Sequence, residues 1–326
     1  MLFLESPSTN PYFNLALEEH IFHTVGQSEN CLIFWQNENT VVIGRYQNTI
    51  EEINSDVVKE RNIRVVRRLS GGGAVYHDLG NLNYTIIVDQ QQFPDFDFKL
   101  FTAPVIEALH RLGITAEFTG RNDLTIDGKK FSGNAQYIHN GRIMHHGCIM
   151  VETDVERVSE ALQVRAAKFQ SKSTKSVRSR VTTINANAPQ PITVSAFKQT
   201  LLERIGNQNP LTPLHLSDED LLAVRTLQQE KYETWEWNYG ASPAFDMQRE
   251  MKFPAALVSA HLSVSDGKIK AIRFYGDFFS SRDVSVLENQ LVGIPINEHL
   301  EETLSQLPIS EYMSGITAAD LCRLLQ

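Results

Sequence analysis

One segment of the chain combines two arginines with three consecutive glycines: residues 67–78 read RRLSGGGAVYHD. Glycines let backbone N–H groups approach an anion with no Cβ in the way, and arginines offer forked donors of fixed charge. The combination predicts a loop that binds a phosphate or a carboxylate. The segment contains neither Gly-Lys-Ser/Thr nor GxGxxG, so it is not a P-loop or a dinucleotide fingerprint. A glycine-rich hairpin with solvated arginines is the alternative interpretation.

A second group of polar residues follows later in the chain. Asn122 and Asp123 begin a strand-like run, and Lys130 follows in the segment DGKKFSGNA. An amide suits a nucleotide, a carboxylate oxygen suits Mg²⁺, and a lysine suits the charge that develops on a phosphate or acyl oxygen. Taken alone, the group also fits an ordinary hairpin with an exposed lysine.

The distribution of charge limits what the chain can bind. It carries 30 Lys and Arg against 39 Asp and Glu, a net charge of −9, which argues against nucleic acid and anionic membranes as partners. Between Arg165 and Arg180, however, six residues are basic and none is acidic. A local positive field of this kind suits ATP, pyrophosphate or an acidic carrier domain, whereas a merely solvated loop is the alternative.

Elements that could position these residues follow from hydrophobic periodicity. A helix is predicted over 11–24, with Asn10 at the N-cap and Pro11 in the first turn. Short apolar runs predict strands over 31–35, 40–43, 63–66 and 82–88, with a helical stretch at 50–60. The dipeptides Asp127-Gly128 and Asn140-Gly141 predict hairpins, so part of the sheet is antiparallel.

The second half of the chain predicts helices, a long loop and then a separate small unit. Helical patterns cover 155–162, 195–205 and 217–231, and a polar loop covers 170–187. Strands follow at 246–253, 256–264 and 269–274, and helices at 284–291, 297–307 and 317–325. A length of 326 residues predicts about two domains, and we place them at 1–240 and 241–326.

Composition also bears on location and on the thiols. No apolar run is long enough to span a membrane and no secretion signal begins the chain, so we expect a cytoplasmic protein. Cys31, Cys148 and Cys322 show neither disulfide nor metal spacing. We interpret Cys148 as a small buried residue of a strand, and His77, His145 and His146 as structural hydrogen-bonding groups.

Longer segments carry a family resemblance. In order, the chain contains FNLALEEHIF, GRYQN, RRLSGGGAVYHDLGN, GRNDL, GKKFSGNAQ, HHG, KSVRSRVT and WEWNYGASPAF. With these motifs the chain resembles the lipoate-protein ligases over nearly its whole length. The resemblance implies an α+β fold, in which a mixed-sheet catalytic domain of the biotin/lipoate ligase type, related to class II aminoacyl-tRNA synthetases, carries a small α+β C-terminal accessory domain.

The resemblance also implies an activity. It is an ATP-dependent, AMP-forming ligase that converts free lipoate, or octanoate, to lipoyl-AMP with Mg²⁺. The lipoyl group then passes to a specific lysine of apo-lipoyl carrier domains. The implied carriers are the E2 subunits of 2-oxo-acid dehydrogenases and the H protein of glycine cleavage, and no nucleic acid or membrane takes part.

Site residues can be carried over position by position. The resemblance assigns Lys130 as the catalytic lysine, which contacts the lipoyl carboxylate and the adenylate phosphate, and Asp123 as a Mg²⁺ ligand. It assigns the loop 175–182 as the segment that folds over the adenylate. The positions implied to bind ATP or lipoyl-adenylate, besides Lys130, are Arg67, Arg68, Ser70, Gly71, Gly72, Gly73, Ala74, Val75, Tyr76, Asn122, Asp123, Gly133, Ala135, His146, Ser176 and Arg178.

Other functions remain open at this point. One is an ATP-independent octanoyl or lipoyl transferase that uses Cys148 as nucleophile, another is a non-catalytic lipoate-binding sensor, and biotin ligase is a weaker third. Trp35 and Val42 could form the wall of an acyl tunnel, but their pattern is that of core residues. We also expect the accessory domain to move between the two half-reactions, which would admit the carrier.

Overall fold

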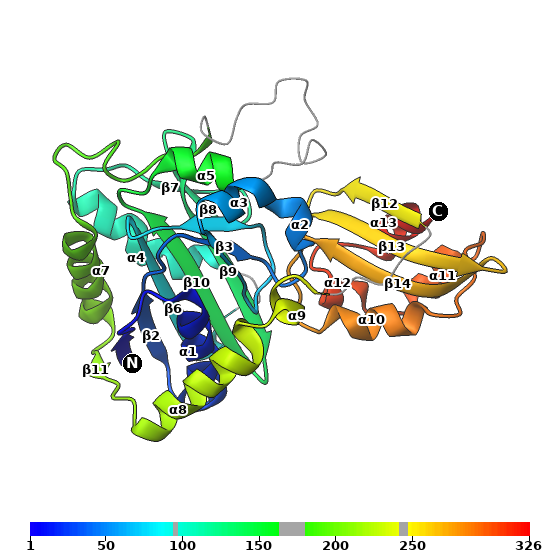
Figure 1. Ribbon diagram of the computed structural model, residues 1–326, viewed down its shortest axis with the longest axis horizontal. Helices are drawn as coiled ribbons and strands as arrows, with labels where there is room; N and C mark the ends of the chain where they lie inside the picture. Colours follow the sequence, from blue (N-terminus) through cyan, green and yellow to red (C-terminus); the bar gives the residue numbers. More distant parts are fainter. Residues whose placement is uncertain (94–96, 163–179, 241–246) are drawn as a thin grey trace.

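We describe a computed structural model of the chain over residues 1–93, 97–162, 180–240 and 247–326 (Figure 1). Its largest element is an eight-stranded mixed sheet in the order β11-β1-β2-β6-β10-β9-β8-β7. β1 pairs in parallel with β2 and β11, and the other neighbours pair antiparallel. The strands are β1 (Leu2–Glu5), β2 (Cys31–Trp35), β6 (Asn81–Asp89), β7 (Glu117–Thr119), β8 (Asp123–Ile126), β9 (Lys129–His139), β10 (Arg142–Met150) and β11 (Thr212–Pro213).

Two hairpins build the β8-β9-β10 part of this sheet, as the turn dipeptides predict. Asp127 and Gly128 have φ values of 49° and 73°, and Asn140 and Gly141 have 49° and 72°. Both positions of each turn therefore lie in the left-handed region, where Asp, Asn and Gly are the tolerated residues.

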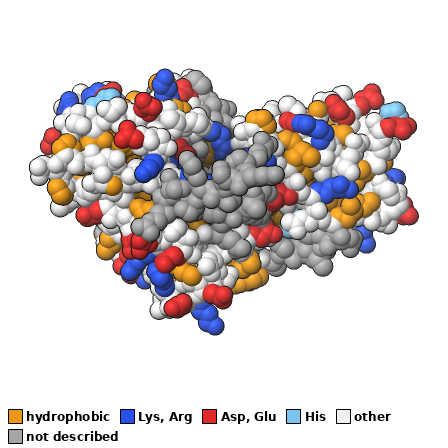
Figure 2. All heavy atoms as spheres, turned by 90° about the horizontal axis from the view of Figure 1, so that it is seen from above, with side chains coloured by type: hydrophobic (Ala, Val, Ile, Leu, Met, Phe, Trp, Pro, Cys, Tyr) orange, Lys and Arg blue, Asp and Glu red, His pale blue; other side chains and the backbone are white. Residues whose placement is uncertain are grey.

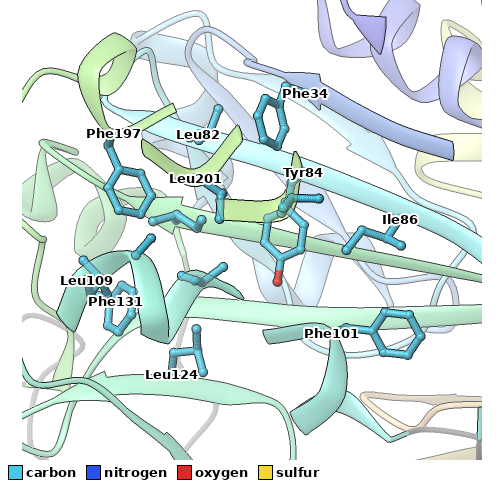
Figure 3. Close-up of a cluster of buried hydrophobic side chains, with 14 of the residues drawn as sticks. Phe34, Leu82, Tyr84, Ile86, Phe101, Leu109, Leu124, Phe131, Phe197 and Leu201 are labelled. Atoms are coloured by element: carbon cyan, nitrogen blue, oxygen red, sulfur yellow. The ribbon is translucent and has the colours of Figure 1, made fainter. Parts of the chain in front are cut away.

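Helices cover both faces of the large sheet. Because side chains alternate along a strand, Leu32 and Phe34 of β2 point to one face and Ile33 and Trp35 to the other. The first face packs against α4 (Phe98–Arg111) and α7 (Val194–Gln208), and Figure 3 shows the apolar side chains between them. The second face packs against α1 (Pro11–His23) and α8 (Asp218–Leu227), which a π-helical turn, Gln228–Tyr232, continues.

A small three-stranded sheet, in the order β4-β3-β5, carries the glycine segment. Its strands are β3 (Thr40–Ile43), β4 (Arg64–Arg67) and β5 (Val75–His77), and residues 68–74 connect the last two. The helix predicted over 50–60 is in fact two, α2 (Thr49–Glu52) and α3 (Ser55–Glu60). The break occurs because Ile53 is extended and the Asn54 side chain accepts the Val57 N–H, which starts a new helix.

The C-terminal part, residues 247–326, has its own sheet and its own hydrophobic core. The strands β12 (Met247–Lys252), β13 (Leu257–Ser265) and β14 (Lys268–Gly276) match the predicted ones closely. The helices are α10 (Val284–Leu291), α11 (Leu300–Ser305), α12 (Ile309–Tyr312) and α13 (Ala318–Leu325). The mixed sheet with a smaller α+β part confirms the expected fold class.

The junction between the two parts involves α2 and α9 (Trp235–Asn238), which lie between the two sheets in Figure 1. Arg121 Nη2 donates to the Asp277 carbonyl at 3.0 Å, and its guanidinium lies 4.5 Å from the centre of the Phe279 ring. Tyr46 stacks on Phe278 at 4.8 Å between ring centres. Figure 2 shows acidic and basic side chains interspersed over one face of both parts.

The remaining described helix near the site is α5 (Val155–Ala161), which packs against α3 and β5. No helix in the described ranges combines the length and apolar character that crossing a membrane requires.

Candidate functional site

The floor of the candidate site follows from the strand register. Directly paired residues of neighbouring strands point to the same face of a sheet. One row across the large sheet consists of Trp35, Asn83, Cys148, Gly133 and Asp123. A second row, two residues along each strand, consists of Ile33, Thr85, His146 and Ala135. Ile33 and Trp35 pack against α1, so both rows lie on the face of the sheet that this helix covers.

A pocket opens above this floor. Its walls come from α1, from β3, from the glycine segment and from the two rows. Leu15, Trp35, Val42 and Val75 form apolar walls, Lys130 brings a charge to the pocket, and Asn83 and His77 are further polar groups of its lining. The lining residues are Leu15, Trp35, Val42, Arg68, Gly73, Ala74, Val75, His77, Asn83, Asn122, Lys130, Gly133, Asn134, Ala135, His146, Gly147 and Cys148. A pocket that combines a charged group with apolar walls suits an amphiphilic acid.

Lys130 supplies a partly exposed positive charge to the pocket. Its Nζ lies 2.7 Å from Asp123 Oδ1, and 33% of its side chain is exposed. Burial alone would lower the pKa of Lys130, but the charge of Asp123 and its hydrogen bond outweigh burial, so the pKa is raised. The lysine therefore stays protonated at neutral pH. Val181 pairs with Lys130 in a parallel bridge, and the Thr182 N–H donates to the Lys130 carbonyl at 2.8 Å.

The three glycines of the RRLSGGG segment differ in their surroundings and backbone conformation. A Cβ on Gly71 would lie 2.1 Å from the Phe278 carbonyl oxygen, so only glycine fits against the C-terminal part. Gly72 has φ of +88°. Gly73 has no atom within 4 Å of its Cβ position, and it lines the pocket. Only Gly73 thus leaves open space for a ligand to approach the backbone.

Arg68 holds the glycine segment in shape. Its guanidinium is buried and donates to Ser70 Oγ at 3.0 Å and to the carbonyls of Gly71 and Gly73 at 2.7 and 2.8 Å. Burial lowers the pKa of Arg68 to about 10, so it remains charged at neutral pH. The residue lines the pocket and also positions its own loop.

A buried hydrogen-bond chain continues from Ser70 to α1. With the imidazole proton on Nδ1, the Ser70 hydroxyl donates to His146 Nε2 at 2.6 Å and His146 Nδ1 donates to Glu18 Oε1 at 2.8 Å. Thr85 Oγ1 donates to the same Glu18 oxygen at 2.6 Å and accepts from Trp35 Nε1 at 2.9 Å. The side chains in this series of hydrogen bonds are all paired with one another, so the series ties the glycine segment to the floor of the pocket.

Arg67 points away from the pocket. It donates to the carbonyls of Gly44, Gln47 and Trp237 at 2.9, 2.7 and 2.9 Å, and to Thr49 Oγ1 at 2.6 Å. Further bonds reach the carbonyls of Arg45 and Asn238. All three guanidinium nitrogens are therefore bonded to other parts of the chain, and the side chain fixes the junction instead of facing a ligand.

Because side chains alternate along β5, the predicted binding residues on this strand do not all face the pocket. Val75 and His77 line the pocket, but Tyr76 points to the other side of β5, where its hydroxyl donates to Asn39 Oδ1 at 3.0 Å. Of the predicted binding residues, those that the structure brings to the pocket are Arg68, Gly73, Ala74, Val75, Asn122, Lys130, Gly133, Ala135 and His146. Asp123 pairs with Lys130 at its edge.

The other predicted residues fall into two groups. Arg67, Ser70, Gly71, Gly72 and Tyr76 are not among the lining residues. Ser176 and Arg178, together with most of the loop 175–182, lie outside the described residues.

Several lining residues were not predicted as site residues. Cys148 is buried in β10 as expected, and it also lines the pocket. Trp35 and Val42 are core residues that line the pocket at the same time. Asn83 gave no sequence signal at all. Glu18, which accepts from His146 but does not line the pocket, did give a signal, because a carboxylate on the apolar side of a helix is unusual unless it has a partner.

We next consider which residues at the pocket could bind a metal ion. Within the described ranges, no group of three or more His, Cys, Asp and Glu side chains is placed to hold one. Asp123 is a single carboxylate at the charged end of the pocket. It fits a Mg²⁺ ion that arrives with nucleotide phosphates and needs one or two protein carboxylates.

Solved structures with a similar arrangement identify the class as lipoate ligases. A bi-partite lipoate protein ligase from Thermoplasma acidophilum, studied with its E2 lipoyl domain, is 29% identical, with a TM-score of 0.64 over 76% of this chain and 98% of that one. A lipoate-protein ligase A bound with ATP is 27% identical, with a TM-score of 0.62 over 73% and 97%.

Sequence comparisons give the family. The family model of the lipoyl protein ligase A/B catalytic domain matches residues 10–206, and that of the bacterial lipoate protein ligase C-terminus matches residues 242–325. Lipoate-protein ligase LplJ of Bacillus subtilis is 41% identical over 330 residues, which cover 100% of both chains. The chain therefore belongs to the lipoate-protein ligase family.

Proposed function

We propose that this chain activates free lipoate, or octanoate, with ATP and transfers the acyl group to a lysine of an apo-lipoyl carrier domain. One observation carries the proposal: a single pocket combines a protonated lysine and an open glycine backbone with the apolar side chains of Leu15, Trp35 and Val42. That arrangement suits a carboxylate with an apolar chain next to a phosphate. The ATP-bound relative and the relative studied with an E2 lipoyl domain support the same reading.

The first half-reaction needs no base. A carboxylic acid is already ionised at pH 7, so a carboxylate oxygen attacks the α-phosphorus of ATP while the bond to the bridging oxygen breaks and pyrophosphate leaves. Lys130 binds the carboxylate and stabilises the charge that develops on the phosphoryl oxygens. The Gly73 backbone provides close approach without a side chain in the way. The products are lipoyl-AMP and pyrophosphate.

The second half-reaction transfers the acyl group. The ε-amine of the carrier lysine, after losing its proton to solvent, attacks the carbonyl carbon of the mixed anhydride, and the bond to the phosphate oxygen breaks so that AMP leaves. The enzyme contributes position and exclusion of water more than covalent chemistry. The E2 subunits of 2-oxo-acid dehydrogenases and the H protein of glycine cleavage are the proposed carriers.

Magnesium belongs to the nucleotide in this proposal. Asp123 is the residue that would bind it, although the same carboxylate also pairs with Lys130. When bound, the ion neutralises phosphate charge and makes pyrophosphate a better leaving group.

The C-terminal part is proposed to be a separate accessory domain, with the division at 240/241. Its independent core and the two separate family matches support this division. We further propose that it moves between the two half-reactions to admit the carrier. A truncation after Tyr239 that leaves both half-reactions unchanged would rule this movement out as a requirement.

No observation favours the cysteine route. Cys148 lies in the pocket, but burial raises the pKa of its thiol, so the thiolate that a nucleophilic mechanism requires is scarce at neutral pH. An acyltransferase that works without ATP would need the opposite shift.

The decisive experiment is incubation with ATP, Mg²⁺, lipoate and an apo-lipoyl domain, followed by mass spectrometry of the carrier. We expect a mass gain of one lipoyl group that requires ATP. Lys130→Ala should slow the gain by about 100-fold or more. Lys129→Ala is the matched control, because Lys129 is the exposed neighbour and does not line the pocket. A mass gain without ATP, or equal rates for both variants, would contradict the proposal.

A further inference from the structure

Asn83 is a buried amide in the floor of the pocket. It lies between Trp35 and Cys148 in the first row, and its side chain is 0% exposed. Among the described residues, neither Oδ1 nor Nδ2 of this amide has a hydrogen-bond partner. A buried amide without partners costs free energy, and it persists in a folded protein when it has another use.

His77 brings a second unpaired group to the same pocket. The Asn37 amide accepts from Asn14 through Oδ1 at 2.8 Å, so its Nδ2 faces His77 Nδ1, at 3.3 Å, as a donor. The proton of the neutral imidazole is therefore on Nε2, and this buried N–H has no partner within the described part of the chain. Burial, followed by the charges of Arg68 and His146, lowers the pKa of His77 to about 3, which keeps the ring neutral.

The place of Asn83 along the pocket matters as much as its chemistry. Lys130 Nζ lies 2.9 Å from the Cβ position of Gly133, which is in the same row as Asn83. Gly133 and Asn83 are two strands apart, which is roughly 9.5 Å at the usual strand spacing. An acid whose carboxylate meets Lys130 and whose chain follows the row would thus bring the far end of an eight-carbon chain to Asn83.

We infer that Asn83 and His77 form a polar subsite that recognises the dithiolane sulfurs of lipoate and so favours lipoate over an unsubstituted fatty acid of the same length. The inference rests on the proposed function. Sulfur is a weak acceptor, and the Asn83 Nδ2 and His77 Nε2 groups are donors. Octanoate offers hydrogen atoms on carbon at the same place, which leaves both donors unpaired, and a site built to hydrogen-bond its ligand discriminates against an analogue without the acceptor.

The test compares Asn83→Leu with the wild-type chain. We would measure kcat/KM for pyrophosphate release with lipoate and with octanoate, and the midpoint of thermal unfolding without ligand. The lipoate-to-octanoate ratio should fall roughly three- to tenfold, the scale of one net hydrogen bond. The unfolding midpoint should rise, because leucine keeps the branched shape of the side chain and removes an unpaired buried amide. A merely structural amide would give the opposite sign of the second result.

Asn81→Leu is the matched control on the same strand and the same face. Asn81 is equally buried and its Nδ2 also has no partner among the described residues, but its Oδ1 accepts from Thr153 Oγ1 at 2.7 Å and from the Asp78 N–H at 3.2 Å, and it does not line the pocket. This variant should lower the unfolding midpoint and leave the ratio unchanged. Asn83→Ala provides a second replacement, for which the ratio should fall as well. An unchanged ratio in both Asn83 variants would overturn the inference.

Direct binding separates this inference from the proposed function. Calorimetric titration of the free chain with lipoate and octanoate needs no turnover. If the wild-type chain releases no pyrophosphate but binds lipoate more tightly than octanoate only while Asn83 is present, the subsite stands and the proposed reaction fails. If pyrophosphate is released normally and Asn83→Leu binds the two acids with the wild-type ratio, the reaction stands and the subsite fails.

Discussion

The two sides of the glycine segment differ in what they do. On the pocket side, Gly73, Ala74 and Val75 face open space. On the junction side, Gly71 touches the Phe278 carbonyl, and Arg67 of the preceding strand bonds to Trp237 and Asn238. A motif that looks uniform in sequence thus lines a pocket on one side and attaches other parts of the chain on the other.

The three basic residues near the glycine segment therefore differ in their roles. Arg67 and Arg68 are both buried and bond mainly to backbone carbonyls of the protein, whereas Lys130 is partly exposed at the pocket. Substitutions on the junction side should therefore act on stability, and those on the pocket side on catalysis.

The strongest test of this contrast is Arg67→Met. The variant leaves several buried carbonyl acceptors and a buried Thr49 hydroxyl without their donor, so the free energy of unfolding should fall by about 3 kcal/mol or more. Urea unfolding measures this loss. Arg64→Met, on the same strand, is the control: its ion pair with Glu38 is exposed and long, at 3.6 Å, and the change should stay within about 0.5 kcal/mol. Equal losses would remove the distinction.

Gly71→Ala and Gly73→Ala compare the two sides directly. The first places a methyl group 2.1 Å from the Phe278 oxygen and should destabilise the protein by about 1–3 kcal/mol. The second meets no atom within 4 Å, so unfolding should hardly change, but the methyl group should lower kcat/KM for lipoate. Thermal unfolding and steady-state rates distinguish them. A Gly73 variant as unstable as the Gly71 variant would contradict the assignment of sides.

His77 should make stability depend on pH. Its folded pKa, about 3, lies below the value of about 6.5 for an unfolded histidine, so the unfolded chain takes up the proton first. The stability from keeping His77 neutral is complete above about pH 6.5 and is lost as the pH falls toward 3, at about 1.4 kcal/mol per pH unit. His77→Asn should reduce this slope in urea unfolding between pH 5 and 6. His299→Asn, at a site 70% exposed, should leave the slope as it is.

Cys148→Ala should have the smallest effect. The thiol is a lining group and not the nucleophile in the proposed reaction, so transfer of lipoate with ATP should remain within about threefold of wild type, a change below 1 kcal/mol. Complete loss of activity would instead support the cysteine route. The same mass-spectrometric assay serves for this variant.

Local signals predicted much of the fold correctly. Asn10 accepts the Tyr12 N–H at the start of α1, and β2 and β3 occupy the predicted residues, because their caps and apolar runs are local. Helix α4 was not predicted, since Pro104 interrupts its pattern. Packing of its buried side chains against the sheet outweighs that interruption, and Asp97 caps the helix.

The site could be predicted only in part. Lys130 and Gly73 belong to contiguous motifs, so both could be predicted. That Tyr76 does not line the pocket follows from the alternation of side chains along β5. The placement of Asn83 beside Cys148 and Trp35 requires the register of three strands distant in sequence, which no local pattern contains. Likewise, the bonding of Arg67 depends on residues about 170 positions away.

That last separation has a consequence for synthesis of the protein. Chains emerge from the ribosome N-terminus first, and β4 is made long before Trp237 and Asn238. Until residue 238 is available, the buried guanidinium of Arg67 lacks two of its acceptor residues, and the strand that leads into the glycine segment lacks its anchor. We therefore expect the nascent chain to fix β4 in place only after residue 238 is available, whereas the hairpins of β8, β9 and β10 need only local contacts.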